Sequence, residues 1–412
     1  MENVFCKAFD ERTIAGGSIG GLQMGIHNQN IPVPQIVAVD KQVDHLTIRW
    51  ASGGHARFHY QWLRDNCRSP ERFDSSTSER KALTESIPAN LGAGSVRIDD
   101  GQLSIKWSDG GPDSRFDTDW LYRNAYDPAP VAADPVQHMW GGEYAEALAT
   151  FSYRDVMEDD SMAAQMIGAF ERFGLVRLEG MRTVQGEVER FAKRLAYVRE
   201  IAFDRVADIK VSLDPYTLGF TSAALPLHTD CSGYSWPPNV MVFHCLKNEV
   251  AGGASQYVDG ARVVAELGHD DPESLRILTT FDVEFRLWSR KADTLSRCPP
   301  IILDASGHLA ILRYANWTVQ PLRTVPFEMV PRWYDAWRAL ARRVNAPENR
   351  VSYRCRPGEA LLINNHRVLH GRDAFDSGEG VRHFQQVYME LDVLVVCPRF
   401  ACCSYCSGVQ AS

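Results

Sequence analysis

An internal repeat constrains the fold of the first third of this chain more than any other feature. One copy reads Thr47-Ile-Arg-Trp-Ala-Ser-Gly-Gly, followed by Phe58 and Trp62-Leu-Arg-Asp-Asn66. The other reads Ser104-Ile-Lys-Trp-Ser-Asp-Gly-Gly, followed by Phe116 and Trp120-Leu-Tyr-Arg-Asn124. Alternating apolar and polar residues before a Gly-Gly pair predict two strands joined by a tight turn. The aromatic residues at matching positions are explained by packing, so we expect a small β-rich domain over residues 33–125.

The rest of the chain predicts a larger domain between two irregular ends. Residues 1–32 are rich in Gly, Asn and Gln and are expected to form a flexible arm, and prolines and alanines over 126–150 predict a linker. Helical spacing of apolar residues then predicts three helices, from Asp159 to before Gly174, near 185–199 and around 329–344. Between them lie short strand-like runs such as Val240–Leu246 and His383–Met389. Short strands with helices beside them predict a sandwich or barrel over 151–396, followed by a tail over 397–412.

Composition and charge argue against several classes of protein. The 412 residues are 45% hydrophobic and 23% charged, which is ordinary for a soluble globular protein. A net charge of −8 argues against nucleic acid or an anionic membrane as the main partner. We find neither the apolar core of a secretory signal nor a run of eighteen apolar residues, so we expect a cytoplasmic protein without a transmembrane helix. The ten scattered cysteines are expected to be reduced, and the cluster at Cys402, Cys403 and Cys406 lacks a partner histidine for metal binding.

The stretch Leu225-Pro-Leu-His-Thr-Asp230 carries the strongest chemical signal. Residues two apart on a strand point to the same side, so His228 and Asp230 would present an imidazole and a carboxylate to one point. The iron(II) of an oxygenase needs two histidines and one carboxylate on one face, which leaves positions open for substrates. His370 is the expected third ligand, with His366 as the alternative.

Two other residues have expected roles near this motif. Arg382 follows His370 by twelve positions, and a guanidinium can hold a carboxylate with two parallel hydrogen bonds. His244 lies within a strand-like run and is expected to be structural.

Several motifs in order along the chain resemble the γ-butyrobetaine dioxygenase family, which includes trimethyllysine dioxygenase and is close to the taurine dioxygenases. In the N-terminal domain, Trp62-Leu-Arg-Asp-Asn-Cys67 is similar to the opening motif of the family. The other similar motifs are Leu225–Asp230, Phe243-His-Cys-Leu-Lys247, Gly252-Gly-Ala-Ser255, Val258-Asp-Gly260, Arg367-Val-Leu-His-Gly-Arg-Asp373 and Arg382-His-Phe384.

The resemblance implies a double-stranded β-helix, or jelly-roll, catalytic domain with buttressing helices. It implies iron(II) at His228, Asp230 and His370, with Arg382 and Ser255 binding the distal carboxylate of 2-oxoglutarate. Decarboxylation of 2-oxoglutarate to succinate and CO2, with O2 consumed, would be coupled to hydroxylation of an unactivated C–H bond. Because Asp230 is retained, hydroxylation is favoured over halogenation. The resemblance also implies an assisting role for ascorbate, a small zwitterionic substrate and a homodimer.

The sequence departs from the family at its zinc site. Members often bind zinc in the N-terminal domain through three cysteines and a histidine, but here only Cys67 remains, with Ser69 and Arg72 at the other cysteine positions. One thiolate cannot form a four-ligand site, so we predict no zinc.

The substrate pocket of the family holds a trimethylammonium group in an aromatic cage. By the resemblance, Phe203, Phe220 and Tyr388 are cage residues, whereas Ala207 opens one wall; Trp288, Tyr234 or Trp236 could complete it. For the acid group, Thr217 replaces an asparagine and Asn316 keeps its companion. Three bases in the same segments could serve a more highly charged acid such as a phosphonate: Lys210, Arg286 and Arg313.

Three hypotheses follow for the function. The first is an iron dioxygenase that acts on a γ-butyrobetaine-like trimethylammonium acid, with 2-(trimethylammonio)ethylphosphonate or a natural-product intermediate as alternative substrates. The second is a catalytically silent jelly-roll binding protein, against which the retention of all three candidate ligands and Arg382 argues. The third is a zinc hydrolase, in which Arg382 and Ser255 would have no role.

Overall fold

The computed structural model describes residues 34–394, apart from residues 75, 78, 100, 128–136, 203 and 379. The chain divides into two compact units, one up to Ala132 and one from Ala133. The predicted arm, the tail with its cysteines and Phe203 lie outside the described residues.

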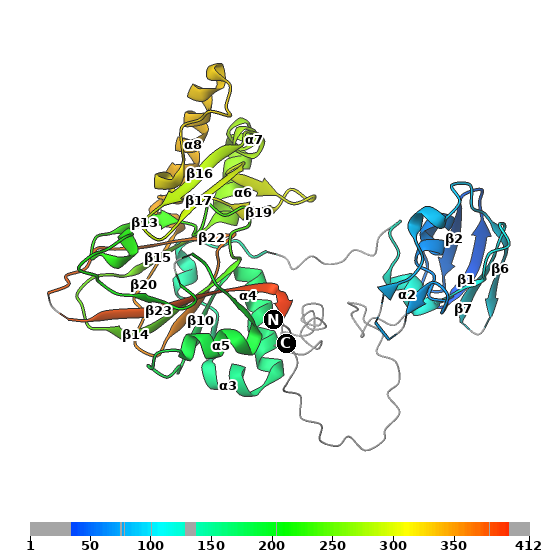
Figure 1. Ribbon diagram of the computed structural model, residues 1–412, viewed down its shortest axis with the longest axis horizontal. Helices are drawn as coiled ribbons and strands as arrows, with labels where there is room; N and C mark the ends of the chain where they lie inside the picture. The colour runs from blue at the N-terminus through cyan, green and yellow to red at the C-terminus, as the bar shows by residue number, and fades with distance from the viewer. Residues whose placement is uncertain are drawn as a thin grey trace, which may run out of the picture. The chain divides into compact units, whose positions relative to one another are not determined.

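The first unit contains two equivalent three-stranded antiparallel sheets, as the repeat predicts (Figure 1). Each copy pairs its strands in the same register, with Leu46 opposite Phe58 and Leu103 opposite Phe116. The sheets are β1 (Ile36–Lys41), β2 (His45–Trp50) and β3 (His55–His59), and β6 (Ala93–Asp99), β7 (Gln102–Trp107) and β8 (Ser114–Asp117). Each is followed by a short helix, α1 (Tyr60–Asp65) or α2 (Thr118–Arg123), and the small strands β4 (Phe73–Asp74) and β5 (Glu79–Arg80) pair between the two copies.

The core of this unit comes from both copies of the repeat. Leu63 and Leu121 are fully buried, and the indole rings of Trp62 and Trp120 stack with centroids 5.4 Å apart. The buried Cys67 sulfur accepts a hydrogen bond from the Ser69 amide at 3.5 Å. The expected absence of zinc stays a prediction.

The second unit is built on two sheets. The larger has seven strands: β9 (Thr150–Ser152), β10 (Leu175–Glu179), β11 (Ala196–Arg199), β12 (Ala207–Ile209), β14 (Val240–Asn248), β21 (Ala360–Asn364) and β23 (Arg382–Leu394). The smaller has four, in the order β13 (Leu225–His228), β22 (Val368–Arg372), β15 (Ser255–Asp259) and β20 (Arg350–Tyr353). Met241 and Tyr388 of the larger sheet share one core with Tyr257 and Val368 of the smaller. Two curved sheets around a common core agree with the expected jelly-roll class.

Helices cover this unit on two sides (Figure 1). The helices α3 (Tyr153–Glu158), α4 (Asp160–Phe173) and α5 (Glu187–Leu195) form one apolar core with the larger sheet. The helices α6 (Gly260–Asp270), α7 (Pro272–Thr280) and α8 (Val330–Val344) form another, with the hairpins β16 (Val283–Trp288)–β17 (Asp293–Cys298) and β18 (Ile301–Leu303)–β19 (Leu309–Leu312). The predicted buttressing is therefore present. Among the described helices, none has the length and apolar character that crossing a membrane requires.

Helix ends follow local sequence where caps are strong and tertiary pairing where they are weak. Asp159 caps α4 by accepting a hydrogen bond from the Ser161 amide, and Gly174 ends the helix at φ +69°, both as predicted. The helix expected over 185–199 ends at Leu195 instead, because residues 196–199 pair with β23 as strand β11. Part of the predicted linker also packs into the unit, since Trp140, Tyr144 and Leu148 are buried.

Candidate active site

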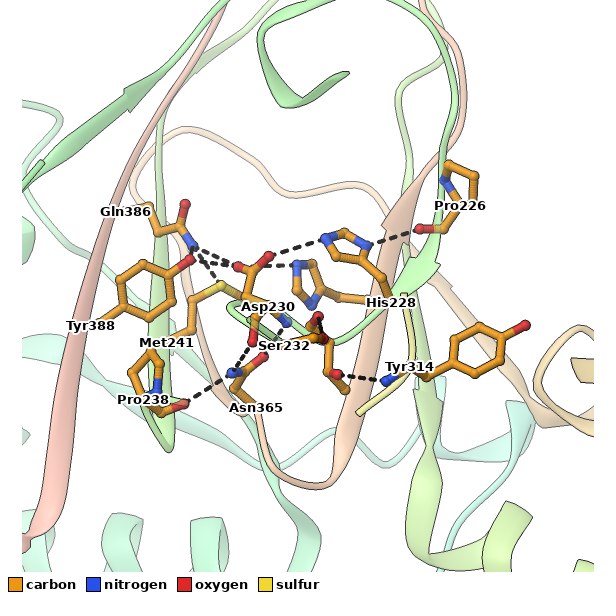
Figure 2. Close-up of polar contacts among 12 residues, drawn as sticks. Pro226, His228, Asp230, Ser232, Pro238, Met241, Tyr314, Asn365, Gln386 and Tyr388 are labelled. Carbon is orange, nitrogen blue, oxygen red and sulfur yellow. Dashed lines mark hydrogen bonds and ion pairs between the residues drawn. The ribbon is translucent and has the colours of Figure 1, made fainter. Parts of the chain in front are cut away.

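Two paired strands bring His228 and His370 together. Strands β13 and β22 are antiparallel, and their register places His228 opposite His370, with ring centroids 4.2 Å apart. Asp230 Oδ1 lies 3.1 Å from His228 Nε2, and its Oδ2 lies 3.6 Å from His370 Nε2 (Figure 2). All three potential ligand atoms lie within 4.8 Å of one another. The side chains therefore converge on a point that one metal ion could occupy.

Asp230 reaches this point from a turn. Strand β13 ends at His228, so the strand alternation from which we expected the convergence is the wrong explanation for it. The Asp230 amide donates to Asn365 Oδ1 at 2.7 Å, and Asn365 Nδ2 donates to the carbonyls of Asp230 and Pro238. The following residue, Cys231, has φ +60°, a conformation that non-glycine residues rarely adopt. The turn between β21 and β22, which contains Asn365, thus holds the turn that directs the carboxylate.

The protonation states at this point suit a divalent cation. Burial opposes ionisation of Asp230, but His370, His228 and the Tyr388 hydroxyl outweigh it and hold the pKa of Asp230 below its usual range. Burial, helped by neighbouring His228, lowers the pKa of His370 to about 3, so its imidazole is neutral. His228 Nδ1 lies 2.9 Å from the Pro226 carbonyl, a contact that fixes the proton there and leaves Nε2 as the ligand atom. Neutral imidazoles and an ionised carboxylate are the forms that bind metal, so these residues fit iron(II).

The three side chains lie in a cavity of about 430 Å³ whose lining includes Ser255, Arg372 and Arg382. Arg382 is buried, with its guanidinium carbon 4.1 Å from the Phe384 ring centroid, and its side chain forms no hydrogen bond or ion pair with a described residue. Arg372 differs, because its guanidinium donates to the carbonyls of residues 219, 221 and 223. Of the two arginines, Arg382 is therefore free to receive an anion.

The cavity includes some of the expected substrate residues and not others. Thr217, Phe220 and Tyr388 line it, and the Tyr388 hydroxyl donates to Asp230 Oδ2 at 2.6 Å. Asn316 and Arg313 are not among the lining residues. Asn316 Oδ1 accepts a hydrogen bond from Trp337 in α8, and the buried Arg313 donates to the Ser235 carbonyl, so neighbouring segments engage both side chains.

His366 and His244, the other two histidines considered in the sequence analysis, do not join the candidate metal ligands. His366 Nε2 lies 2.8 Å from the Pro237 carbonyl, and His366 is not part of the group of candidate ligands. His244 is fully buried, and neither ring nitrogen has a hydrogen-bond partner.

Further aromatic residues line the cavity. Trp288 lines the cavity, whereas Tyr234 and Trp236 do not. Tyr216 and Trp317 also line the cavity, although no sequence motif singled them out, and the Trp317 ring lies 5.0 Å from the His228 ring. Tyr216 lies outside regular structure and Trp317 in the short 3-10 turn Asn316–Thr318, so no residue periodicity indicates the direction of either side chain.

Two family models match the chain. One, described as "Taurine catabolism dioxygenase TauD, TfdA family", matches residues 132–388, and the other, described as "Gamma-butyrobetaine hydroxylase-like, N-terminal", matches residues 37–122. They account in order for most of both units.

Known proteins are similar to this chain over most of its length and most of their own. The γ-butyrobetaine dioxygenase of Pseudomonas sp. (strain AK-1) is 33% identical over 355 residues, which are 85% of this chain and 92% of that protein. The mitochondrial trimethyllysine dioxygenase of Rattus norvegicus is 30% identical, over 85% of this chain and 83% of that protein. The γ-butyrobetaine dioxygenase of Homo sapiens is 28% identical, over 85% and 92%. Together with the geometry of the cavity, these matches establish that the chain belongs to the TauD/TfdA family and is an iron(II)- and 2-oxoglutarate-dependent dioxygenase.

Proposed function

We propose that this enzyme hydroxylates a C–H bond of a small trimethylammonium acid of the γ-butyrobetaine kind, with iron(II) held by His228, Asp230 and His370. One observation carries the proposal. These three side chains converge in a cavity that also contains Arg382, a buried cation without a hydrogen bond or ion pair to the described residues. A site with both features suits iron and the free carboxylate of 2-oxoglutarate.

The protein's own groups would orient the reactants. Bound iron(II), with 2-oxoglutarate and O2, supplies the oxidising power for C–H hydroxylation. The Pro226 carbonyl fixes the His228 ring, and Tyr388 and Gln386 both donate to Asp230 Oδ2. Arg382 would donate two parallel hydrogen bonds to the distal carboxylate of 2-oxoglutarate, and the Ser255 hydroxyl a third. Desolvating that carboxylate is costly unless it is paired in this way.

The lining of the cavity supports a quaternary ammonium group in the substrate. Asp230 is the one acidic residue among the described residues that line it, and it belongs to the candidate metal site. A trimethylammonium group donates no strong hydrogen bond and is attracted instead to aromatic faces. The lining offers such faces from Tyr216, Phe220, Trp288 and Trp317.

The charges of the lining support a carboxylate in preference to a phosphonate. Arg372 and Arg382 are the cations among the described lining residues; carbonyls engage the first, and 2-oxoglutarate would occupy the second. Arg313 lies outside the lining, and Arg286 pairs with Asp293 through two contacts of 2.7 and 2.6 Å. The described lining would therefore offer no free arginine or lysine to the acid group of the substrate, which favours a singly charged carboxylate over a doubly charged phosphonate.

The test is a substrate panel with purified enzyme, iron(II) and 2-oxoglutarate. It contains γ-butyrobetaine, trimethyllysine, 2-(trimethylammonio)ethylphosphonate and the tert-butyl isostere of γ-butyrobetaine. We expect succinate and a product with one added oxygen atom from γ-butyrobetaine, and binding of the isostere weaker by about 1–2 kcal/mol, the scale of a desolvated cation–π contact. Equal turnover of the isostere would contradict the aromatic recognition. The homodimer and the cytoplasmic location also remain proposals, which gel filtration and cell fractionation test.

A further inference from the structure

Residues 210–224 contribute one wall of the cavity but have little packing of their own. Tyr216 and the run Thr217–Phe220 line the cavity, yet none of residues 210–224 is buried. Its regular structure is a single short turn, Leu218–Phe220. Because so little apolar area is removed from water, hydrophobic packing contributes little to the position of this segment. Its hydrogen bonds to the rest of the protein must determine its position.

Arg372 makes the most extensive of these attachments. It lies on β22 two residues after His370, and its side chain is buried. Its Nη2 lies 2.7 Å from the carbonyl oxygens of Thr221 and of Ala223, and its Nη1 lies 3.3 Å from that of Gly219. One planar guanidinium thus holds three carbonyls of a five-residue stretch, a geometry that an ammonium group does not reproduce.

The other attachments are single or exposed. The Phe375 amide donates to the Ser222 carbonyl at 3.1 Å. Arg290 of the β16–β17 hairpin contacts the Asp214 carboxylate at 2.7 Å and the Asp214 carbonyl at 3.1 Å, and Lys291 Nζ lies 5.0 Å from the Tyr216 ring centroid. The side chains of Arg290, Asp214 and Lys291 are exposed. Exposed ion pairs contribute little, because water screens them and ordering two long side chains is costly. Among the described residues Arg372 has no acidic partner, and the hydrogen bonds of its two Nη groups all go to this segment, while its buried Nε has no partner.

We propose that Arg372 is a positioning residue for substrate recognition and does not bind 2-oxoglutarate. By fixing residues 219–223, Arg372 orients Thr217 and Phe220 toward the substrate. Arg372 itself has no catalytic role. The inference rests on the proposed function, because it assigns these two residues to the substrate. It separates the roles of two buried arginines that line one cavity.

The first test measures the segment itself, without any substrate. Hydrogen exchange of the full-length protein is followed by mass spectrometry in wild type, Arg372→Lys and Arg372→Gln. We expect peptides from 210–224 to exchange about tenfold faster in both variants, the effect of weakening one or two charge-assisted hydrogen bonds. Peptides from β14 should not change, which shows that the fold is intact. The matched control is Arg276→Lys, in which an exposed arginine paired with Glu273 is changed in the same way. Unchanged exchange in both Arg372 variants would overturn the proposal.

The second test compares two KM values. In Arg372→Lys, we expect KM for the panel substrate to rise about tenfold while KM for 2-oxoglutarate and the affinity for iron(II) change less than about twofold. A larger rise in KM for 2-oxoglutarate than for the substrate would overturn the proposal and make Arg372 a cosubstrate ligand. If no compound of the panel is turned over, the proposed substrate class fails, while hydrogen exchange still decides the role of Arg372.

Discussion

Two parts of the cavity are held in place in different ways. One is its base, formed by His228, His370, Arg382 and Tyr388, and the other is its closing region, formed by residues 210–224 and Trp288. At the base, His228, His370, Arg382 and Tyr388 lie in or beside paired strands, and each is at most 6% exposed. In the closing region, no residue of 210–224 is buried, and Trp288 is 77% exposed. Buried strand pairing fixes atoms to a fraction of an ångström, as metal chemistry requires. A segment held by a few hydrogen bonds allows substrate recognition to differ without disturbing that chemistry.

The largest expected effect comes from the base. Asp230→Ala removes the carboxylate on which both histidines converge, so succinate formation should fall to background while the apparent affinity for iron falls by more than about 100-fold. Iron retained after gel filtration and succinate release measure the two effects. Asp335→Ala, which removes an exposed carboxylate in α8, is the control and should behave as wild type. Full activity of Asp230→Ala would disprove the metal site.

Substitution of Arg382 tests whether the base of the cavity also binds 2-oxoglutarate. Loss of one partner of a buried charged pair costs about 3–5 kcal/mol, so Arg382→Ala should raise KM for 2-oxoglutarate by about two to three powers of ten, with iron affinity preserved. Arg382→Lys should recover part of the loss, because an ammonium group cannot make two parallel hydrogen bonds. Initial rates at varied 2-oxoglutarate measure this. An unchanged KM would mean that another group binds the cosubstrate.

His244, which is fully buried in β14, tests how burial of an ionisable side chain affects the free energy of unfolding. Burial lowers its pKa to about 4, below the value of about 6.5 in the unfolded chain. Between these values the unfolded state binds more protons, so the free energy of unfolding should rise with pH from about 4 to 6.5 and be lost as pH falls. His244→Leu should remove up to about 3 kcal/mol of this dependence.

Urea unfolding at pH 4.5 and 7.5 measures that difference. The control is His269→Leu, which makes the same substitution at an exposed histidine. An identical pH dependence in wild type and His244→Leu would show that the buried imidazole does not contribute.

The smallest expected effect comes from the closing region. Trp288 is largely exposed, where a cation–π contact contributes about 0.5–1 kcal/mol, so Trp288→Ala should raise KM for the substrate about two- to fivefold. KM for 2-oxoglutarate should not change. Phe327→Ala, an exposed aromatic outside the cavity lining, should change neither value. A larger effect on 2-oxoglutarate than on the substrate would remove the distinction between the two regions.

Local sequence determined the features that depend on neighbouring residues. The repeat predicted both hairpins, because alternation and Gly-Gly turns act over a few residues. Asp159 and Gly174 predicted the ends of α4 for the same reason. The order of motifs along the chain was sufficient for the family, which the matches to both units confirm.

Only the tertiary structure decided which groups meet. Asp230 joins the two histidines because Asn365, 135 residues away, holds its turn, and not because it alternates with His228 on a strand. Likewise, the sequence indicates Arg382 as the anion-binding arginine but does not show what Arg372 contacts. The segment whose carbonyls engage Arg372 lies about 150 residues earlier, at separations of 149 to 153. Local sequence sets the backbone conformation, whereas the partner of a buried side chain depends on which distant segments the fold packs against it.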